Sequence, residues 1–181
     1  MNPDNPETHT FVTPEADVML RALEPEDLDF LYTLENDSAM WLVGNANVPY
    51  SRFTLNNYVM TSSSDIYADR QLRLIIQKPD GTSVGLLDIF DFDPRHLRAE
   101  VGVAILKEER DKGYGHVALM KAIDYCRRII HLHQLYALID VRNTHSLQLF
   151  QGAGFNKASL LKDWLYDGGH FCDACMMHVF L

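Results

Sequence analysis

The residues with the spacing of a ligand-binding loop are 110–115, which read Arg-Asp-Lys-Gly-Tyr-Gly. They follow residues 101–106, a β-branched and apolar stretch typical of a strand, and a long helical pattern begins directly after them. A helix that starts in such a turn presents free backbone N–H groups and the positive end of its dipole. Glycines at 113 and 115 allow the backbone to approach a bulky phosphate closely. The segment therefore predicts an anion site for a phosphate group.

Two other phosphate-binding motifs do not fit this loop. The dinucleotide fingerprint G-x-G-x-x-G would need a third glycine where the chain has Ala118, and a P-loop would need Gly-Lys followed by Ser or Thr. What remains is R-x-x-G-x-G after a strand. An ordinary glycine-containing turn between a strand and a helix is the alternative, because it would show the same pattern.

The elements that must position this loop follow from hydrophobic periodicity and turn residues. Strands are expected at 18–23, 70–77, 83–92, 97–106, 135–141, 155–162 and 171–181. Helices are expected from 24 to about 36, from 52 or 54 to 61, directly after the loop, and at 144–152. Turn residues at 79–82 and 93–96 join three consecutive strands as antiparallel neighbours. We expect an α+β domain with a mostly antiparallel sheet of about seven strands, flanked by about four helices.

Composition limits the function classes. A chain of 181 residues suits one domain, which we place at 17–181 after a flexible leader at 1–16. The net charge of −9 argues against binding to nucleic acid and would attract cationic substrates. No apolar run is long enough to cross a bilayer, and no signal peptide opens the chain. We therefore expect a cytoplasmic protein with reduced cysteines, no membrane partner and an oligomeric state left open, a homo-oligomer included.

A second motif follows the strand expected at 135–141. Residues 143–155 read Asn-Thr-His-Ser-Leu-Gln-Leu-Phe-Gln-Gly-Ala-Gly-Phe. Together with R-x-x-G-x-G and the order of the elements, this motif resembles the GNAT acetyltransferase family over residues 19–181. The resemblance implies a GNAT-like fold and direct transfer of an acetyl group from acetyl-CoA to a primary amine, with no metal and no acyl-enzyme.

Within that family, residues 20–27, 98–100 and 132–136 are similar to the branch of bacterial spermidine or diamine and ribosomal-protein alanine acetyltransferases. Acids in residues 65–69 and at the helix end formed by Glu35 and Asn36 would lie near the expected acceptor cleft, which favours a polyamine, a diamine or another small amine. Two alternatives stay open. One is a protein N-terminal α-amine as the acceptor, and the other is an acyl-CoA-binding module with weak or no catalysis.

Amine acetylation needs a proton acceptor, because free alkyl amines are mostly protonated at pH 7, with a reference pKa of about 10.4. Strand alternation places Glu100 on one face with Gly102 and Ala104, directly before the cofactor segment. Glu100 is therefore our candidate for a general base that acts through water, or for an acceptor-binding carboxylate. An ion pair with Arg98 or with a neighbouring strand is the alternative. The oxyanion is expected to meet a backbone N–H of the central strand.

The resemblance also implies the cofactor contacts. Backbone groups of Val103, Ala104 and Ile105 would pair with the pantetheine amides. The pyrophosphate would lie on Arg110, Asp111, Lys112, Gly113, Tyr114, Gly115 and His116, and Asn143 and Phe150 would complete the cofactor site. A plain helix cap is the alternative for Asn143.

Phe150 departs from the family pattern, because polyamine-type members have a tyrosine there that protonates the leaving thiolate, and Phe150 has no proton to give. Ser146, one helical turn earlier, is our candidate for a donor, with helix packing as the alternative. Tyr136 and Tyr114 are weaker candidates. Loss of the acid would slow the reaction without abolishing it, because thiols titrate near a pKa of about 8.5.

A cluster near the C-terminus resembles a metal site by composition alone. His170, Cys172, Cys175 and His178 lie within nine residues. Residues three apart on a strand point to opposite faces, so the two cysteines could not share a metal without a bulge. We therefore expect no metal there and a packed strand with reduced thiols.

Overall fold

The computed structural model describes residues 16–37, 48–63 and 65–181. Most of the expected leader at 1–16 lies outside the described residues. The described strands form one seven-stranded sheet in the order β1-β2-β3-β4-β5-β7-β6. Their bounds are β1 Met19–Ala22, β2 Leu72–Gln77, β3 Ser83–Asp93, β4 Arg98–Ile105, β5 Gln134–Asp140, β6 Asn156–Tyr166 and β7 Phe171–Phe180. Every neighbouring pair is antiparallel except β4 and β5.

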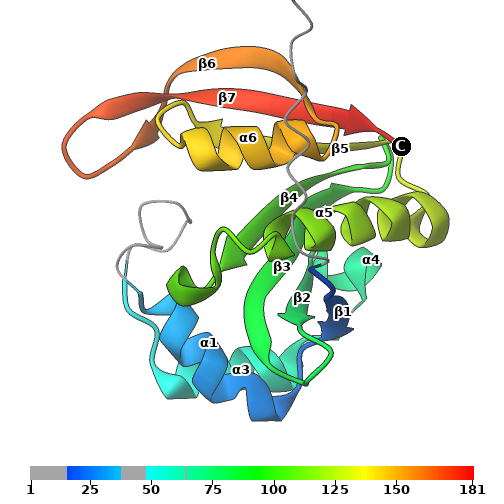
Figure 1. Ribbon diagram of the computed structural model, residues 1–181, viewed down its shortest axis with the longest axis vertical. Helices are drawn as coiled ribbons and strands as arrows, with labels where there is room; N and C mark the ends of the chain where they lie inside the picture. The colour runs from blue at the N-terminus through cyan, green and yellow to red at the C-terminus, as the bar shows by residue number, and fades with distance from the viewer. Residues whose placement is uncertain (1–15, 38–47, 64) are drawn as a thin grey trace, which may run out of the picture.

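The described helices connect and cover this sheet (Figure 1). Their bounds are α1 Leu28–Glu35, α3 Arg52–Thr61, α4 Ile66–Asp69, α5 Tyr114–Tyr125 and α6 Thr144–Gly152. Three further helical turns are η1 Pro25–Asp27, η2 Lys107–Glu109 and the π-helical turn η3 Cys126–Ile130, which extends α5. Each of the five described α-helices contributes at least one buried apolar side chain to the hydrophobic core.

Two hydrophobic clusters lie on opposite faces of the sheet, because successive strand residues point to opposite faces. The larger cluster packs α5 and α6 against strand residues such as Leu87, Val101 and Ile139. The smaller cluster packs α1 and α3 against Ile75 and Leu86. Figure 1 shows the consequence: α1 and α3 lie beside β2 and β3, α6 lies beside β5 and β7, and α5 crosses between the two groups.

The sheet is nearly divided between β4 and β5. These strands pair over three residues only, from Arg98 opposite Gln134 to Glu100 opposite Tyr136. Beyond this point β4 continues alongside β3, while β5 continues alongside β7. The two strands therefore diverge in Figure 1, and the second half of β4 has β3 as its only strand neighbour among the described residues.

The expected fold class is confirmed: the sheet has seven strands and is mostly antiparallel. The helix expected at 144–152 has those bounds in α6. The helix α4 lies between the expected helix ending at 61 and the expected strand starting at 70 and was not anticipated, because a single turn gives no detectable period. No described helix combines the length and apolar character that crossing a membrane would require.

Candidate active site

Glu100 lies at the last pair before β4 and β5 diverge. Its side-chain Oε1 accepts a hydrogen bond from the backbone N–H of Leu138 at 3.4 Å. Leu138 is on β5, two residues beyond Tyr136, the last partner of β4. If the pairing of β4 with β5 continued, a backbone oxygen of β4 would accept from this N–H; here the Glu100 carboxylate accepts from it instead.

Burial raises the pKa of Glu100 to about 7, opposed by the hydrogen bond from Leu138 and reinforced by the negative charge of Asp91. A carboxyl group with a pKa near neutrality can gain and lose a proton at physiological pH, which is the property required of a general base or acid. The ion pair with Arg98 that sequence reasoning left open is not formed, since Arg98 pairs with Asp93 at 3.5 Å.

The face of β4 that carries Glu100 also carries Gly102 and Ala104, as strand alternation predicted. The register places Phe90 opposite Glu100 and Asp88 opposite Gly102. A Cβ on Gly102 would stand 3.5 Å from the ring of Phe90, so the ring lies over this glycine. Along β4, Glu100 is thus followed on its own face by a position without a side chain, beside the ring of Phe90.

A charged group on the same sheet face links β2, β3 and α1. Arg73 donates to both oxygens of Asp88 at 2.7 Å and to Glu35 at 2.5 Å. Its guanidinium also lies 5.5 Å from the ring centroid of Tyr58 on α3. Two carboxylates therefore face one guanidinium, so the group carries a net negative charge. Glu35, expected near the acceptor, is held by this ion pair.

The other acids expected near the acceptor stabilise local backbone. Asp65 accepts from the backbone N–H of Tyr67 and caps α4. Asp69 accepts from the backbone N–H of Ser63 at 2.9 Å. These hydrogen bonds account for aspartates at positions 65 and 69 without a bound ligand.

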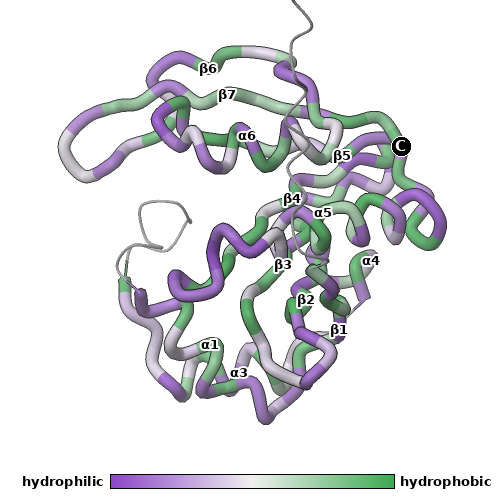
Figure 2. The backbone as a smooth tube through the Cα atoms, in the orientation of Figure 1, coloured by the Kyte–Doolittle hydropathy of each residue, from purple (hydrophilic) through white to green (hydrophobic). Residues whose placement is uncertain are grey.

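The segment between β4 and α5 has the geometry expected of a loop that leads into a helix. Gly113 is the N-cap of α5 with φ of +85°, a left-handed conformation that favours glycine. Arg110 donates from Nε to the backbone oxygen of Ile105 at 3.1 Å, which ties the loop to the end of β4. Figure 2 shows this segment as a hydrophilic stretch between the more apolar β4 and α5.

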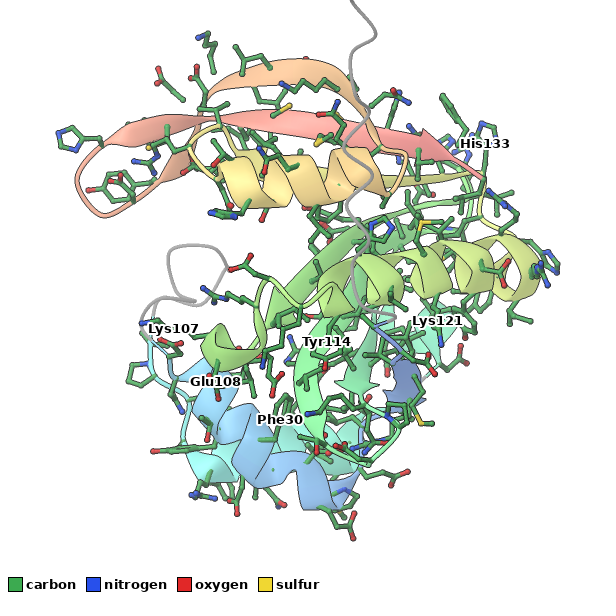
Figure 3. The ribbon with its side chains drawn as sticks, viewed as in Figure 1. Phe30, Lys107, Glu108, Tyr114, Lys121 and His133 are labelled. Carbon is green, nitrogen blue, oxygen red and sulfur yellow. The ribbon has the colours of Figure 1, made fainter. Side chains whose placement is uncertain are left out.

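The first turn of α5 lies close to both β4 and α6. A Cβ on Gly115 would stand 3.5 Å from Leu149 and 3.6 Å from Ile105. Tyr114 packs against the larger hydrophobic cluster, and Figure 3 labels it at the start of α5, with Lys107 and Glu108 on the preceding turn. The side chain of Lys112 pairs with Glu109 at 2.9 Å. His116 lies beside Gly152 of α6.

The second motif forms the start of α6. Asn143 is the N-cap, and its Oδ1 accepts from the backbone N–H of Ser146 at 3.0 Å. This bond accounts for an asparagine at 143, as the helix-cap alternative predicted. Ser146 is partly buried, while Phe150 is only 3% exposed and meets Phe155 edge-on at 5.0 Å. Phe150 is therefore a core residue in this structure.

The His and Cys residues near the C-terminus are dispersed along β7 and its turn. Cys175 is buried, whereas Cys172 is partly buried and contacts Asp167 at 3.5 Å. Within residues 16–37, 48–63 and 65–181, no group of three or more His, Cys, Asp or Glu side chains is arranged to hold a metal ion.

Sequence reasoning missed two features beside Glu100. The first is the backbone donor of Leu138, which becomes available only because β4 and β5 diverge. The second is Asp91, whose charge acts on both Glu100 and Tyr136. The only sequence signal for Asp91 was its position nine residues before Glu100, across a turn.

Comparisons with known proteins identify the family of the chain. The family model for the acetyltransferase (GNAT) domain matches residues 17–156. The chain belongs to the GNAT acetyltransferase family. It is therefore an acetyltransferase-family enzyme with the fold that the sequence predicted.

Particular relatives lie at moderate distance. Spermidine N(1)-acetyltransferase of Escherichia coli K12 is 28% identical over 170 residues, which cover 90% of this chain and 86% of that protein. A putative ribosomal N-acetyltransferase of Bacillus subtilis is 28% identical over 156 residues, covering 84% of this chain and 85% of that protein. The spermidine N-acetyltransferase of Vibrio cholerae, solved in complex with CoA and spermine, superposes with a TM-score of 0.79 at 25% identity, covering 90% of this chain and 95% of that one.

Proposed function

We propose that this enzyme transfers the acetyl group of acetyl-CoA to a primary amine of a polyamine or diamine, with Glu100 as the proton acceptor. The observation that carries the proposal is the Glu100 carboxyl at the divergence of β4 and β5, with a pKa of about 7. The similarity to spermidine acetyltransferases and the negative charge of the whole chain support a cationic acceptor.

The acceptor nitrogen loses a proton to Glu100, directly or through water, and its lone pair then attacks the thioester carbonyl. The C–S bond breaks, the nitrogen, which is positively charged after the attack, gives up a second proton, and the CoA thiolate takes up one proton. The products are the acetylated amine, the CoA thiol and the proton held by Glu100. The pKa of Glu100, about 7, is closer to the pKa of an alkylammonium group, about 10.4, than the pKa of an ordinary glutamate is. Each pKa unit by which the gap between the base and the alkylammonium group becomes smaller lowers the free-energy cost of proton transfer by about 1.4 kcal/mol.

The cofactor would bind to the segments that meet where β4 ends. Backbone groups of Val103, Ala104 and Ile105 have β3 on one side only among the described residues, which leaves the other edge of β4 available for the pantetheine amides. Residues 110–116 would hold the pyrophosphate at the start of α5. For Asn143 and Phe150, the helix cap and the core packing favour an indirect role, in which they place α6 beside this segment.

Ser146 is the proposed proton donor to the thiolate. It lies in the first turn of α6, and its backbone is fixed by the cap at Asn143. Because Phe150 is buried and has no proton to give, a second function, an acyl-CoA-binding module with weak turnover, also has an observation in its favour.

The deciding experiment measures release of the CoA thiol from acetyl-CoA with spermidine, simple diamines, amino-sugar amines and short peptides as acceptors. Turnover with spermidine or diamines and a loss of at least about a hundredfold in Glu100→Gln is expected. Turnover with peptides alone would replace the polyamine assignment by a protein N-terminal one. CoA binding without turnover for any acceptor would favour the binding module.

A further inference from the structure

The strand β3 contains an irregularity directly beside Glu100. Phe90 stands opposite Glu100, but the next paired position is Asp93 opposite Arg98. Three residues of β3 therefore span the distance that two residues of β4 span, so β3 carries one extra residue. Asp91 has φ of +49° at this bulge, a left-handed conformation that aspartate and asparagine adopt more readily than most other residues.

The bulge changes the direction of the neighbouring side chains. In a regular strand, Phe90 and Phe92 would share one face, and Asp91 would point to the other. Instead, the ring of Phe90 lies over Gly102 on the face of Glu100, whereas Phe92 is 4% exposed within the larger hydrophobic cluster. Asp91 is exposed, so the bulge takes its carboxylate away from the α5 side of the sheet, where a charge would be buried.

Within the described residues, Asp91 takes part in none of the ion pairs or side-chain hydrogen bonds that hold its neighbours. Asp88 and Asp93 on the same strand pair with Arg73 and Arg98 respectively. Asp91 thus keeps its negative charge uncompensated, and that charge acts on Glu100 and Tyr136. A like charge on the neighbouring strand, next to the residue that pairs with Glu100, disfavours ionisation of Glu100.

We propose that Asp91 is a positioning residue whose charge adds to the effect of burial in keeping the Glu100 carboxyl group protonated, and that the bulge in β3 places it for this role. The inference rests on the proposed function in taking Glu100 as the base. Without Asp91, Glu100 would ionise at lower pH and would be a weaker proton acceptor for an alkylammonium group.

Several other charged or titratable groups lie around Glu100. They lie on the same face of the sheet or at the nearby ends of the strands: Asp88 and Asp93 of β3, Arg98 of β4, Tyr136 of β5 and His178 of β7. Asp88 and Asp93 are each paired with an arginine, and His178 is hydrogen-bonded to Gln134 at 3.0 Å. Among the charged groups near Glu100, Asp91 is the one whose negative charge raises the pKa of Glu100, in addition to the larger effect of burial.

The test follows the Glu100 carboxyl directly, without catalysis. The backbone amide of Leu138 donates to this carboxyl, so its ¹⁵N and ¹H chemical shifts report the ionisation of Glu100. In protein labelled with ¹⁵N-leucine, we expect the Leu138 signal to titrate with a midpoint near pH 7. Glu100→Gln should abolish this titration, which assigns it.

Asp91→Asn removes the charge and keeps a residue that tolerates the left-handed backbone. We expect its midpoint to fall by about 0.5 to 1 pH unit. The chain offers a matched control in Asp163, which also has φ of +49° at a register shift, in β6. Asp163→Asn makes the same change of net charge and should leave the midpoint in place. An unchanged midpoint in Asp91→Asn, or an equal shift in Asp163→Asn, overturns the proposal.

The pH dependence of kcat at saturating amine then separates the effect of Asp91 on Glu100 from the proposed role of Glu100 as the base. If Asp91 controls the base, the acidic limb of the kcat profile in Asp91→Asn moves in the same direction as the Leu138 titration. If the titration moves and the kcat profile does not, control of Glu100 by Asp91 stands, while proton transfer by Glu100 is refuted.

Discussion

Replacing Glu100 by glutamine should stabilise the folded protein at pH 8, although it removes the proposed base. The folded protein holds this carboxyl with its pKa raised from 4.5 to about 7 by burial. Below about pH 4.5 the group is protonated in both the folded and the unfolded chain, so it makes no difference to stability. Between about pH 4.5 and pH 7 the unfolded chain has released this proton while the folded protein still holds it, so stability falls as pH rises through this range. Above pH 7 both states carry the charge, and the loss of stability levels off.

The size of the effect follows from the same values. One pKa unit corresponds to about 1.4 kcal/mol, so the full difference would be worth about 3 kcal/mol at pH 8. Glu100 is only partly buried, and solvent screening reduces this figure to about 1–2 kcal/mol. Glutamine keeps an oxygen that can accept from Leu138.

Urea unfolding of wild type and Glu100→Gln at pH 5, 6, 7 and 8 measures this difference. The gain in free energy of unfolding should grow with pH and approach its maximum at pH 8, while thiol release falls at every pH. Asp163→Asn again controls for removal of one negative charge at a distant site. A gain that is absent, or that is the same at pH 5 and pH 8, would refute the reasoning about burial of Glu100.

Three further predictions concern backbone positions. Gly85→Ala should lower the free energy of unfolding by about 2–4 kcal/mol in urea titrations, because its Cβ would stand 2.3 Å from the backbone oxygen of Ala104; a loss below 0.5 kcal/mol would contradict this close approach. Gly113→Val should weaken CoA binding at least about tenfold by calorimetry, because Gly113 has φ of +85°, and unchanged affinity would show that the loop does not bind the phosphates. Asn143→Ala should cost about 1 kcal/mol in thermal unfolding through loss of the cap, with Asn143→Asp as the variant that retains it; equal stability of the two variants would contradict the cap.

The parts of the fold that the sequence predicted depend on local signals. Turn residues at 79–82 and 93–96 fix the antiparallel order of β2, β3 and β4, because short turns join neighbouring strands. The cap at Asn143 and the apolar spacing after it determine α6 to the residue. Strand alternation predicted the face of β4 on which Glu100 lies, and the proton acceptor that amine acetylation needs made it the candidate base.

The rest depends on tertiary structure. Phe90, Asp91, Phe92 and Asp93 alternate regularly between apolar and acidic residues, which predicts a regular strand with both rings on one face. The bulge instead separates the two rings: Phe92 packs in the larger hydrophobic cluster, and Phe90 lies beside Gly102 on the other face. Likewise, the sequence of β4 and β5 does not show that their pairing ends at Glu100.

The short pairing of β4 with β5 has a consequence for how the chain opens and closes. Three residue pairs join β1–β4 to β5–β7, and α5 is the helix that contacts β1, β3 and β4 as well as α6. The two parts of the sheet can therefore exchange amide hydrogens as separate cooperative units, each protected by its own antiparallel ladder. In native-state hydrogen exchange, a core substitution in α3 should speed exchange in β2 and β3 alone, whereas one in α5, such as at Leu119, should speed it in both parts at once.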